Sequence, residues 1–268
     1  MSALSDGAVA NLIAQQAEAH GASVLTQKRN MLLTAVRLQR NSGRIVPYHL
    51  RVEVYGGDVR VREERPLQLP IFCPNRHINP GGWFCLGFSQ RDPHRIGDED
   101  AAGAWWRRVL KFLTLQETAK KLRRWPSTVE WAHGAAAIHQ ARAEQCADAL
   151  GPHFAEALGR RRLKVRRHRN APAFQTLCEG PTRLYSVWAG PRRVATQRQR
   201  CFCGSGLALA ACADHAQAAA DLVQALVDWE DAERRFWKSL REDTCCGTMP
   251  DCPMNKGPAR RPTPALAA

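Results

Sequence analysis

Residues 47–63 read PYHLRVEVYGGDVRVRE, in which apolar and polar side chains alternate on both sides of the turn Gly56-Gly57-Asp58. Such alternation is typical of antiparallel strands with one buried face, and the turn is typical of a hairpin. Two neighbouring segments are also predicted as strands, MLLTAVRLQR at 31–40 and LQLPIF at 67–72, the latter at an edge because of its proline. Together they predict a four-stranded antiparallel meander. The side chains expected on its buried face are Tyr48, Leu50, Val52, Val54, Val59 and Val61.

Helices are predicted on both sides of this meander. Residues 5–20 are amphipathic, with Ser5 or Asp6 as the N-cap. Residues 97–124 begin with acidic residues and end with KKLRR, which complements the helix dipole. The sequence STVE at 127–130 is a capping box that would open a second helix to Leu150. The buried stripe of the 97–124 helix is expected to contain Trp105, Trp106, Val109, Leu110, Leu113 and Leu122.

The composition changes after residue 151. Residues 151–200 hold 12 Lys and Arg against 2 Asp and Glu, mostly within GRRRLKVRRHRN at 159–170. This block is either a solvated linker or helix face, or a surface for an anionic partner such as nucleic acid or an acidic protein. A long helix is expected at about 214–243.

The expected fold class is α+β, with a smaller, mainly helical, cysteine-rich module behind the first domain. The predicted boundaries are 1–151 for the first domain, 152–200 for a basic linker or extension, 201–255 for the cysteine-rich module and 256–268 for a disordered tail.

The overall composition indicates a cytoplasmic globular protein that folds without disulfides. A chain of 268 residues can bury a full core. Its first residues lack the basic and apolar regions of a signal peptide, and no run of about 18 apolar residues marks a membrane span. In a reducing compartment, ten cysteines point to metal binding or catalysis.

The most informative cysteine segment is FCPNRHINPGGWFCLGF at 72–88. A thiol that does chemistry is held at a fixed, partly exposed place, with donors nearby that stabilise an oxyanion. The prolines and the Gly81-Gly82 pair would impose an irregular backbone just before Cys85. The pattern favours a reactive thiol at Cys85, and the alternative is a core thiol packed between Phe84 and Leu86.

Placed after a meander and before two helices, this segment resembles the active-site region of the ubiquitin-conjugating enzyme family. Members carry a His-Pro-Asn tripeptide, a short loop and a Gly-x-x-Cys-Leu stretch that holds the catalytic cysteine. The matching residues are Pro74-Asn75 and Gly82-Trp83-Phe84-Cys85-Leu86, and the resemblance covers roughly residues 1–150. Three further stretches resemble the bacterial branch of the family, Trp105-Trp106, Trp125-Pro126 and Trp131-Ala132-His133-Gly134. That branch is encoded beside ubiquitin-like proteins, activating enzymes and metal-dependent isopeptidases, often in defence against phage.

The resemblance implies a fold with an N-terminal helix, a four-stranded meander and two C-terminal helices. It also implies that Cys85 accepts a ubiquitin-like protein from an activating enzyme as a thioester, which an amine of a protein acceptor then attacks. Asn75 matches the motif residue that stabilises the oxyanion, whereas a gapless alignment places His77 there, and either side chain can donate a hydrogen bond. Cys73 replaces the usual histidine and is expected to be structural.

A second cysteine segment, CFCGSGLALAACADH at 201–215, spaces Cys201, Cys203, Cys212 and His215 as a Cys₃His ligand set. Its glycines permit a tight turn that directs two thiolates at one cation, and the second pair arrives at a helix start. The segment resembles the small SEC-C zinc motif, with Ala213 at the usual fourth ligand and His215 as its substitute. Structural zinc is the predicted cofactor, and thiols without metal are the alternative.

Cys245, Cys246 and Cys252 form another group near the end of the chain. If residues 214–243 form one helix, it spans about 45 Å and keeps this group away from the Cys₃His set. A second metal, with Cys178 as a further ligand, is one interpretation of this group.

Two other functions remain open at this stage. In the first, an inactive conjugating fold serves as a zinc-binding adaptor that binds nucleic acid or protein through residues 160–169. In the second, the protein is a cysteine hydrolase in which His133 or His139 is the base for Cys85.

Overall fold

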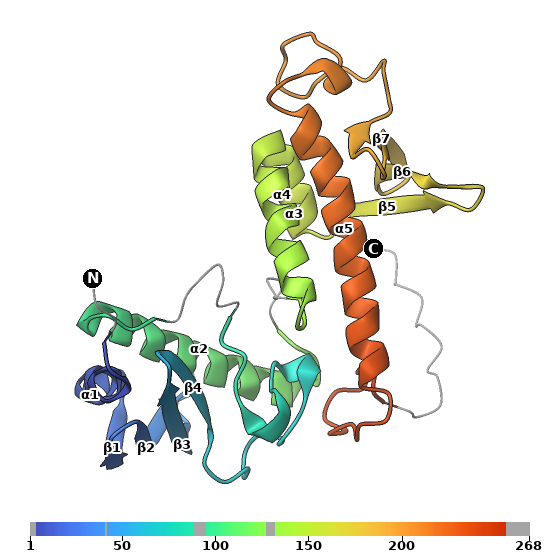
Figure 1. The fold of residues 1–268 in the computed structure, drawn as a ribbon. Helices are drawn as coiled ribbons and strands as arrows, with labels where there is room; N and C mark the ends of the chain where they lie inside the picture. The colour runs from blue at the N-terminus through green and yellow to red at the C-terminus, as the bar shows by residue number, and fades with distance from the viewer. Residues whose placement is uncertain (1–3, 41, 88–94, 127–131, 256–268) are drawn as a thin grey trace. The chain divides into compact units, whose positions relative to one another are not determined.

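The computed structural model describes residues 4–40, 42–87, 95–126 and 132–255 (Figure 1). The chain forms two compact units, of which the first contains Met1–Ser127 and Leu240–Ala268 and the second contains Thr128–Ser239. The predicted capping box at 127–130 and the predicted tail at 256–268 lie outside the described residues. The helix predicted to follow the box is described and begins at Ala136.

The first unit combines a four-stranded antiparallel sheet with two α-helices. Its strands follow the order β1-β2-β3-β4, with one short 3₁₀ turn before the sheet and two between the sheet and α2. The bounds are α1 (Asp6–Gln16), η1 (Glu18–His20), β1 (Ala22–Lys28), β2 (Met31–Gln39), β3 (Ile45–Tyr55), β4 (Asp58–Glu63), η2 (Pro74–Arg76), η3 (Pro80–Gly82) and α2 (Glu99–Leu122). The α+β class is confirmed, and every side chain predicted for the inner face of the meander is buried.

Side-chain caps set the ends of both helices. The Ala8 amide donates to Ser5 Oγ at 3.3 Å, and the Ala101 amide donates to Asp98 Oδ1 at 2.8 Å. Trp106 on α2 donates its indole N–H to the Ile13 carbonyl of α1 at 2.9 Å, which joins the two helices inside the core. The predicted stripe of α2 is correct for Trp105, Trp106, Val109 and Leu113, whereas Leu110 is partly buried and Leu122 is exposed.

The fourth strand of the meander is not the one predicted. Residues 67–72 form no strand, because the Glu63 carboxylate accepts the amides of Gln68 and Leu69 at 2.9–3.0 Å and turns this segment away from a ladder. The fourth position belongs to β1, which pairs with β2. All but one of the β1 side chains are exposed, so its sequence carries no alternating signal.

The second unit contains a second four-stranded antiparallel sheet, which lies within residues 163–194, where the sequence predicts a basic linker or extension. Its order is β5-β6-β7-β8, and α5 lies between this sheet and α3, as Figure 1 shows in orange and green. The bounds are α3 (Ala136–Leu150), α4 (Pro152–Gly159), β5 (Leu163–His168), β6 (Ala171–Glu179), β7 (Thr182–Trp188), β8 (Arg193–Val194), η4 (Leu209–Ala211) and α5 (Ala216–Ser239). In the predicted helical module at 201–255, all of which the structure describes, the elements are η4 and α5, with no strand. The basic block became an edge strand, where charged side chains are common because they discourage further strand pairing.

Tyr48 and Glu117 form a buried hydrogen bond in the core of the first unit, and a mutation there tests how much it stabilises the unit. Tyr48 is 1 % exposed and donates its hydroxyl to Glu117 Oε1 at 2.9 Å, while Arg40 Nη1 donates to Glu117 Oε2 at 3.4 Å. We expect Tyr48→Phe to destabilise the first unit by about 1–3 kcal/mol, because the buried carboxylate loses a donor. Hydrogen exchange of the β3 amides measures the free energy of unfolding of the first unit alone. Tyr55→Phe, on the same strand at an exposed position, is the matched control, and equal exchange in the two variants would contradict the assignment.

Candidate functional site

The segment that carries Cys85 is a backbone ladder attached to the edge of the first sheet. Cys73 and Ile78 exchange two backbone hydrogen bonds of 3.0 Å, and Ile78 in turn forms a bridge with Phe84. The Phe84 amide donates to the Val61 carbonyl of β4 at 2.9 Å, and the Cys85 amide donates to the His77 carbonyl at 2.8 Å. The loop 73–78 and Cys85 are thus fixed side by side, opposite the edge strand.

Two glycines and one histidine make the tight turns of this ladder. Gly81 and Gly82 have φ angles of 78° and 81°, and His77 has a φ of 54°. A side chain at either glycine would be strained by the backbone alone, which accounts for glycine there without any ligand. A left-handed histidine is uncommon, and such residues concentrate at functional sites.

Aromatic rings hold the His77 side of the loop. The His77 ring packs on Trp125 with centroids 4.9 Å apart, and Trp125 contacts Phe112 of α2 at 6.2 Å. Phe112 stacks on Phe84 at 4.6 Å, next to Cys85 in the chain. His77 and Phe84, the residues on either side of the candidate site, are therefore linked through the aromatic rings of Trp125 and Phe112.

Cys85 itself is half-buried. Burial raises the pKa of the Cys85 thiol above its ordinary value, and a hydrogen bond from the Gly87 amide opposes that rise. Cys85 is therefore not a fully buried core residue, and its thiol is neutral at neutral pH. Asn75, on η2, is also half-buried, so both candidate oxyanion donors, Asn75 and His77, lie on the loop whose end pairs with Cys85.

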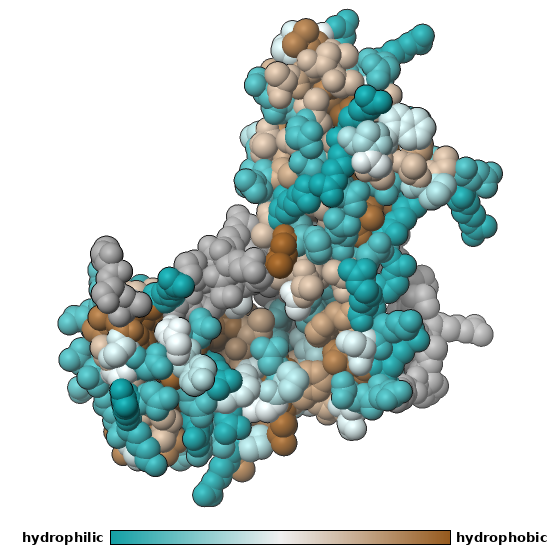
Figure 2. Space-filling view, viewed as in Figure 1, coloured by the Kyte–Doolittle hydropathy of each residue, from teal (hydrophilic) through white to brown (hydrophobic). Residues whose placement is uncertain are grey.

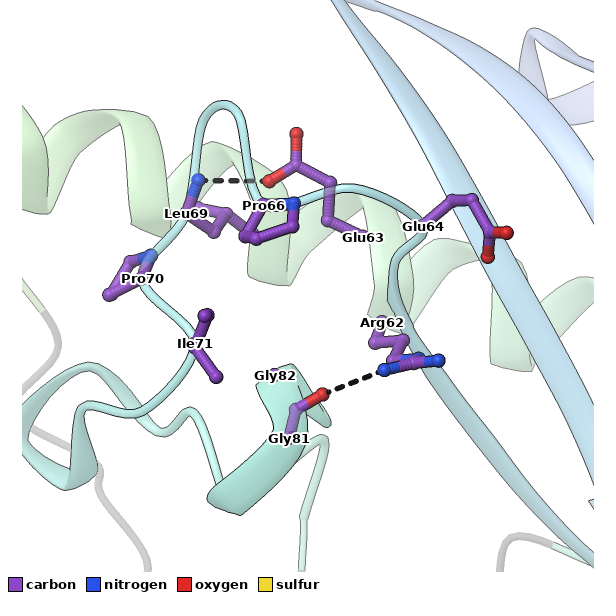
Figure 3. A pocket seen from close by; sticks show the side chains of 9 residues that line it. All are labelled: Arg62, Glu63, Glu64, Pro66, Leu69, Pro70, Ile71, Gly81 and Gly82. Carbon is purple, nitrogen blue, oxygen red and sulfur yellow. Dashed lines mark hydrogen bonds between the residues drawn. The ribbon is translucent and has the colours of Figure 1, made fainter.

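A small pocket lies beside the turn that precedes Cys85 (Figure 3). One wall is the Gly81-Gly82 turn, where Arg62 Nη1 donates to the Gly81 carbonyl at 3.2 Å, and the other is the segment from Pro66 to Ile71. Burial raises the pKa of the Glu63 carboxyl, although the amides that it accepts oppose the rise.

The four residues of the predicted Cys₃His set come together in the second unit. Their ligand atoms all lie within 4.8 Å of one another. The Cys201 and Cys203 sulfurs are 3.3 Å apart, those of Cys203 and Cys212 are 4.0 Å apart, and Cys212 Sγ lies 3.3 Å from His215 Nδ1. Sulfurs bound to one tetrahedral zinc at about 2.3 Å would be about 3.8 Å apart, so the residues fit a metal ion of this size.

The surroundings of this set favour thiolate at its exposed member. The Ser205 hydroxyl and amide lower the pKa of the Cys203 thiol to about 6, whereas burial raises that of Cys201 to about 11. The turn that carries Cys203 contains Gly204 and Gly206, both with positive φ. A cation that neutralises the sulfurs would favour ionisation of all three cysteines.

The third cysteine group lies in the first unit, and Cys73 is its neighbour. The neighbouring Cys246 raises the pKa of the Cys73 thiol, and burial together with the neighbouring Cys245 raises that of Cys252. Cys178, the residue considered for this group, lies on β6 of the second unit, where its thiol contacts the Thr176 carbonyl at 3.9 Å. Cys73 was missed because no local spacing links it to residues so far along the chain.

The histidines considered as bases have partners within the second unit. His133 precedes α3, and its Nδ1 lies 3.2 Å from both carboxylate oxygens of Glu233. Its ring stacks on Phe236 with centroids 4.8 Å apart. His139, on α3, has its Nδ1 4.0 Å from Asp228. These contacts give both histidines a packing role between α3 and α5.

The basic block has a mixed environment. Arg167 forms an ion pair with Asp231 at 2.6 Å, and Arg162 pairs with Glu179 at 2.9 Å. Lys164, Arg166 and Arg169 are exposed, and Figure 2 shows hydrophilic side chains at the outer end of the β5–β6 hairpin. Part of the charge is therefore used inside the unit. Throughout the described ranges, the helices are too short or too polar to cross a bilayer.

Two family models match the chain. Residues 20–127 match the family model described as the prokaryotic E2 domain, and residues 132–254 match the model of the cysteine-rich domain C-terminal to the E2 domain. No curated protein and no solved structure matches the chain. Since the two matches adjoin and together cover most of the chain, the protein belongs to the bacterial E2-like family with a C-terminal cysteine-rich module.

Proposed function

We propose that this conjugating-enzyme-like protein carries a ubiquitin-like protein as a thioester on Cys85 and transfers it to an amine. The observation that carries the proposal is the position of Cys85: half-buried, and paired through its backbone with His77 on the loop 73–78. The family match covers this whole segment. The partners would be the ubiquitin-like protein, its activating enzyme and a protein acceptor.

The chemistry would proceed in two acyl transfers. The Cys85 thiolate attacks the carbonyl carbon of the donor thioester, and the thiolate of the activating enzyme leaves. An acceptor amine then attacks the Cys85 thioester, the Cys85 thiolate leaves, and the amine loses a proton as the amide forms. Each step passes through an oxyanion that a fixed donor stabilises, and Asn75 and His77 are the two candidates.

The rigid loop supports this mechanism more directly than the charge of the thiol does. A raised thiol pKa makes Cys85 a slow nucleophile at neutral pH, so the rate would depend on how the partner's thioester is presented. The ladder to β4 and the rings around Trp125 hold the loop in one geometry without the donor. Such preorganisation lowers the reorganisation that each transfer requires.

The Cys₃His set supports a structural zinc ion in the second unit. Two of its cysteines, Cys201 and Cys212, are buried, and Cys203 and His215 complete the set. A closed set of four protein ligands leaves no position for substrate, so zinc there would stabilise the module and would not take part in acyl transfer. We place the protein in the cytoplasm of a bacterium, within a ubiquitination-like system of the kind used against phage.

The first prediction concerns the covalent intermediate. When the protein is incubated with ATP, the ubiquitin-like protein and the activating enzyme encoded beside it, a band of higher mass should appear on a non-reducing gel and disappear with reductant. Cys85→Ala should abolish this band. Cys146→Ala, at another half-buried thiol, is the matched control and should keep it. A reductant-sensitive band that survives Cys85→Ala would place the thioester elsewhere.

The second prediction distinguishes the two oxyanion candidates. With the thioester already formed, the alanine variant of the residue that donates to the oxyanion should slow discharge to an amine by about 100- to 1000-fold. Asn75→Ala and His77→Ala are compared in single-turnover chases, with His77→Gln to retain a donor. Discharge at the wild-type rate in both alanine variants would show that neither side chain has this role.

The third prediction follows from the raised pKa of Cys85. Alkylating reagents react with the thiolate, so at pH 7 Cys85 should react more slowly than a cysteine in an unfolded peptide, and its rate should still be rising above pH 9. Peptide-level mass spectrometry of timed alkylation measures this rate. In urea the difference should vanish because burial is lost. Faster alkylation than the peptide at pH 7 would contradict the assignment.

A further inference from the structure

Four cysteines gather in the first unit although the sequence separates them widely. Thr248 Oγ1 lies 3.1 Å from Cys246 Sγ and accepts a hydrogen bond from Arg76 Nη1 at 3.4 Å, and the Arg76 amide donates to the Cys73 carbonyl at 2.9 Å, so Cys246 lies beside the loop that carries Cys73. The neighbouring Cys246 raises the pKa of the Cys73 thiol, and burial together with Cys245 raises that of Cys252. The two pairs also lie close enough for Cys252 to interact electrostatically with both Cys73 and Cys246. Cys73 and Cys252 are buried, while Cys245 and Cys246 are half-buried. Four cysteine sulfurs thus come together from two segments, the loop 73–78 and the segment after α5.

We propose that Cys73, Cys245, Cys246 and Cys252 form a second metal site, a tetrathiolate that binds zinc. Four soft sulfur ligands favour zinc among the common divalent metals, and four protein ligands make a closed, structural site. The proposal does not depend on the conjugation chemistry, since Cys85 is not among the ligands.

Backbone amides around this group are arranged to stabilise thiolates. The Gly247 amide donates to Cys245 Sγ at 3.5 Å, the Thr248 amide donates to Cys246, and the Met254 amide donates to Cys252. Each donor lies two residues after its cysteine. The Cys₃His set shows the same pattern, since the Cys203 amide donates to Cys201 and the Ser205 amide to Cys203. Such hydrogen bonds orient metal ligands and favour their charged form.

A buried guanidinium provides a second, independent argument. Arg76 is 2 % exposed, and its hydrogen bonds go to neutral groups: the Gln116 side chain at 2.8 Å, the Gln116 carbonyl at 3.4 Å and Thr248 Oγ1 at 3.4 Å. A buried charge is costly unless an opposite charge lies nearby. The Glu117 carboxylate also acts on Arg76, but Cys73 and Cys246 would act on it more strongly as anions. A dication bound by four thiolates has a net charge of −2 and would supply that counter-charge.

The second group is more open than the first. Among the described residues, only the Cys₃His set has all of its ligand atoms within 4.8 Å of one another. Closure around a metal therefore requires side-chain rotation, which Cys245 and Cys246 can make because they lie in an irregular segment. The competing chemistry for the same contacts is a pair of disulfides, Cys73 to Cys246 and Cys245 to Cys252, and the experiment has to separate the two.

The test is a metal count on the full chain, purified with reductant and zinc and then desalted. Mass spectrometry of the metal should find about two zinc ions per chain in the wild type and in Cys85→Ser. Cys73→Ser and Cys245→Ser should each retain about one, as should Cys203→Ser, which alters the other site. The double variant Cys73→Ser/Cys203→Ser should retain none. Failure to form a Cys85 thioester would leave all these counts unchanged, so the two proposals fail separately.

Several outcomes would overturn the second site. These are two ions in both Cys73→Ser and Cys245→Ser, one ion in the wild type that Cys203→Ser alone removes, or peptides that link Cys73 to Cys246 by a disulfide in the protein as purified. Because Cys73 is buried, its variant can fail to fold, and Cys245→Ser then decides the question. Cobalt(II) added to Cys203→Ser should give the thiolate charge-transfer bands of a four-sulfur site, which Cys245→Ser in the same background should remove.

Discussion

A reciprocal pair of hydrogen bonds between Arg76 and Gln116 fixes the cysteine loop to the long helix of the first unit. Arg76 Nε donates to Gln116 Oε1 at 2.8 Å, and Gln116 Nε2 donates to the Arg76 carbonyl at 2.5 Å. Both side chains are almost completely buried. Removing one partner would leave a buried charge or amide unsatisfied, at a cost of about 1–3 kcal/mol or more. The position of the loop 73–78 on α2 depends on this contact.

The geometry of the candidate active site follows from that constraint. His77 comes directly after Arg76, and its carbonyl accepts the Cys85 amide, so the thiol inherits the position of the loop. On the other side, Phe84 is bonded to β4, whose own position is set by the core of the meander. Cys85 therefore lies between a helix contact and a sheet contact, and neither involves a partner protein. Functional residues on loops held by a rigid scaffold commonly show this arrangement.

The parts of the fold that the sequence predicts are those with strong local signals. Alternation identifies β2, β3 and β4, and the caps at Ser5 and Asp98 identify α1 and α2. The signal fails for β1, which is almost entirely exposed, and for the second sheet, whose edge strand β5 is rich in arginine. Each of these two strands has one buried residue, at its start, and is held by pairing with its neighbouring strand, which no local pattern encodes.

The same distinction holds for the sites. The Cys₃His set lies within 15 residues of sequence, and its spacing is sufficient to predict it. The Cys73–Cys246 contact instead joins residues that are far apart in the sequence. The same holds for the hydrogen bond from Arg76 to Thr248, which spans 172 positions. Spacing rules describe ligands delivered by one turn or one helix, and they are silent on ligands that the fold brings together.

The last residues of the cysteine-rich segment, from Leu240 on, belong to the first unit. Their cysteines, Cys245, Cys246 and Cys252, are in the same unit as Cys73. The chain leaves that unit after Ser127 and returns at Leu240, so the second unit is an insertion with two covalent connections. The helix α5 spans about 36 Å within the second unit, and the cysteines that follow it belong to the first unit. A metal bound by Cys73 and by the cysteines after Leu240 would fix the returning chain to the first unit. An inserted unit tethered at both ends has less conformational freedom than one on a single linker.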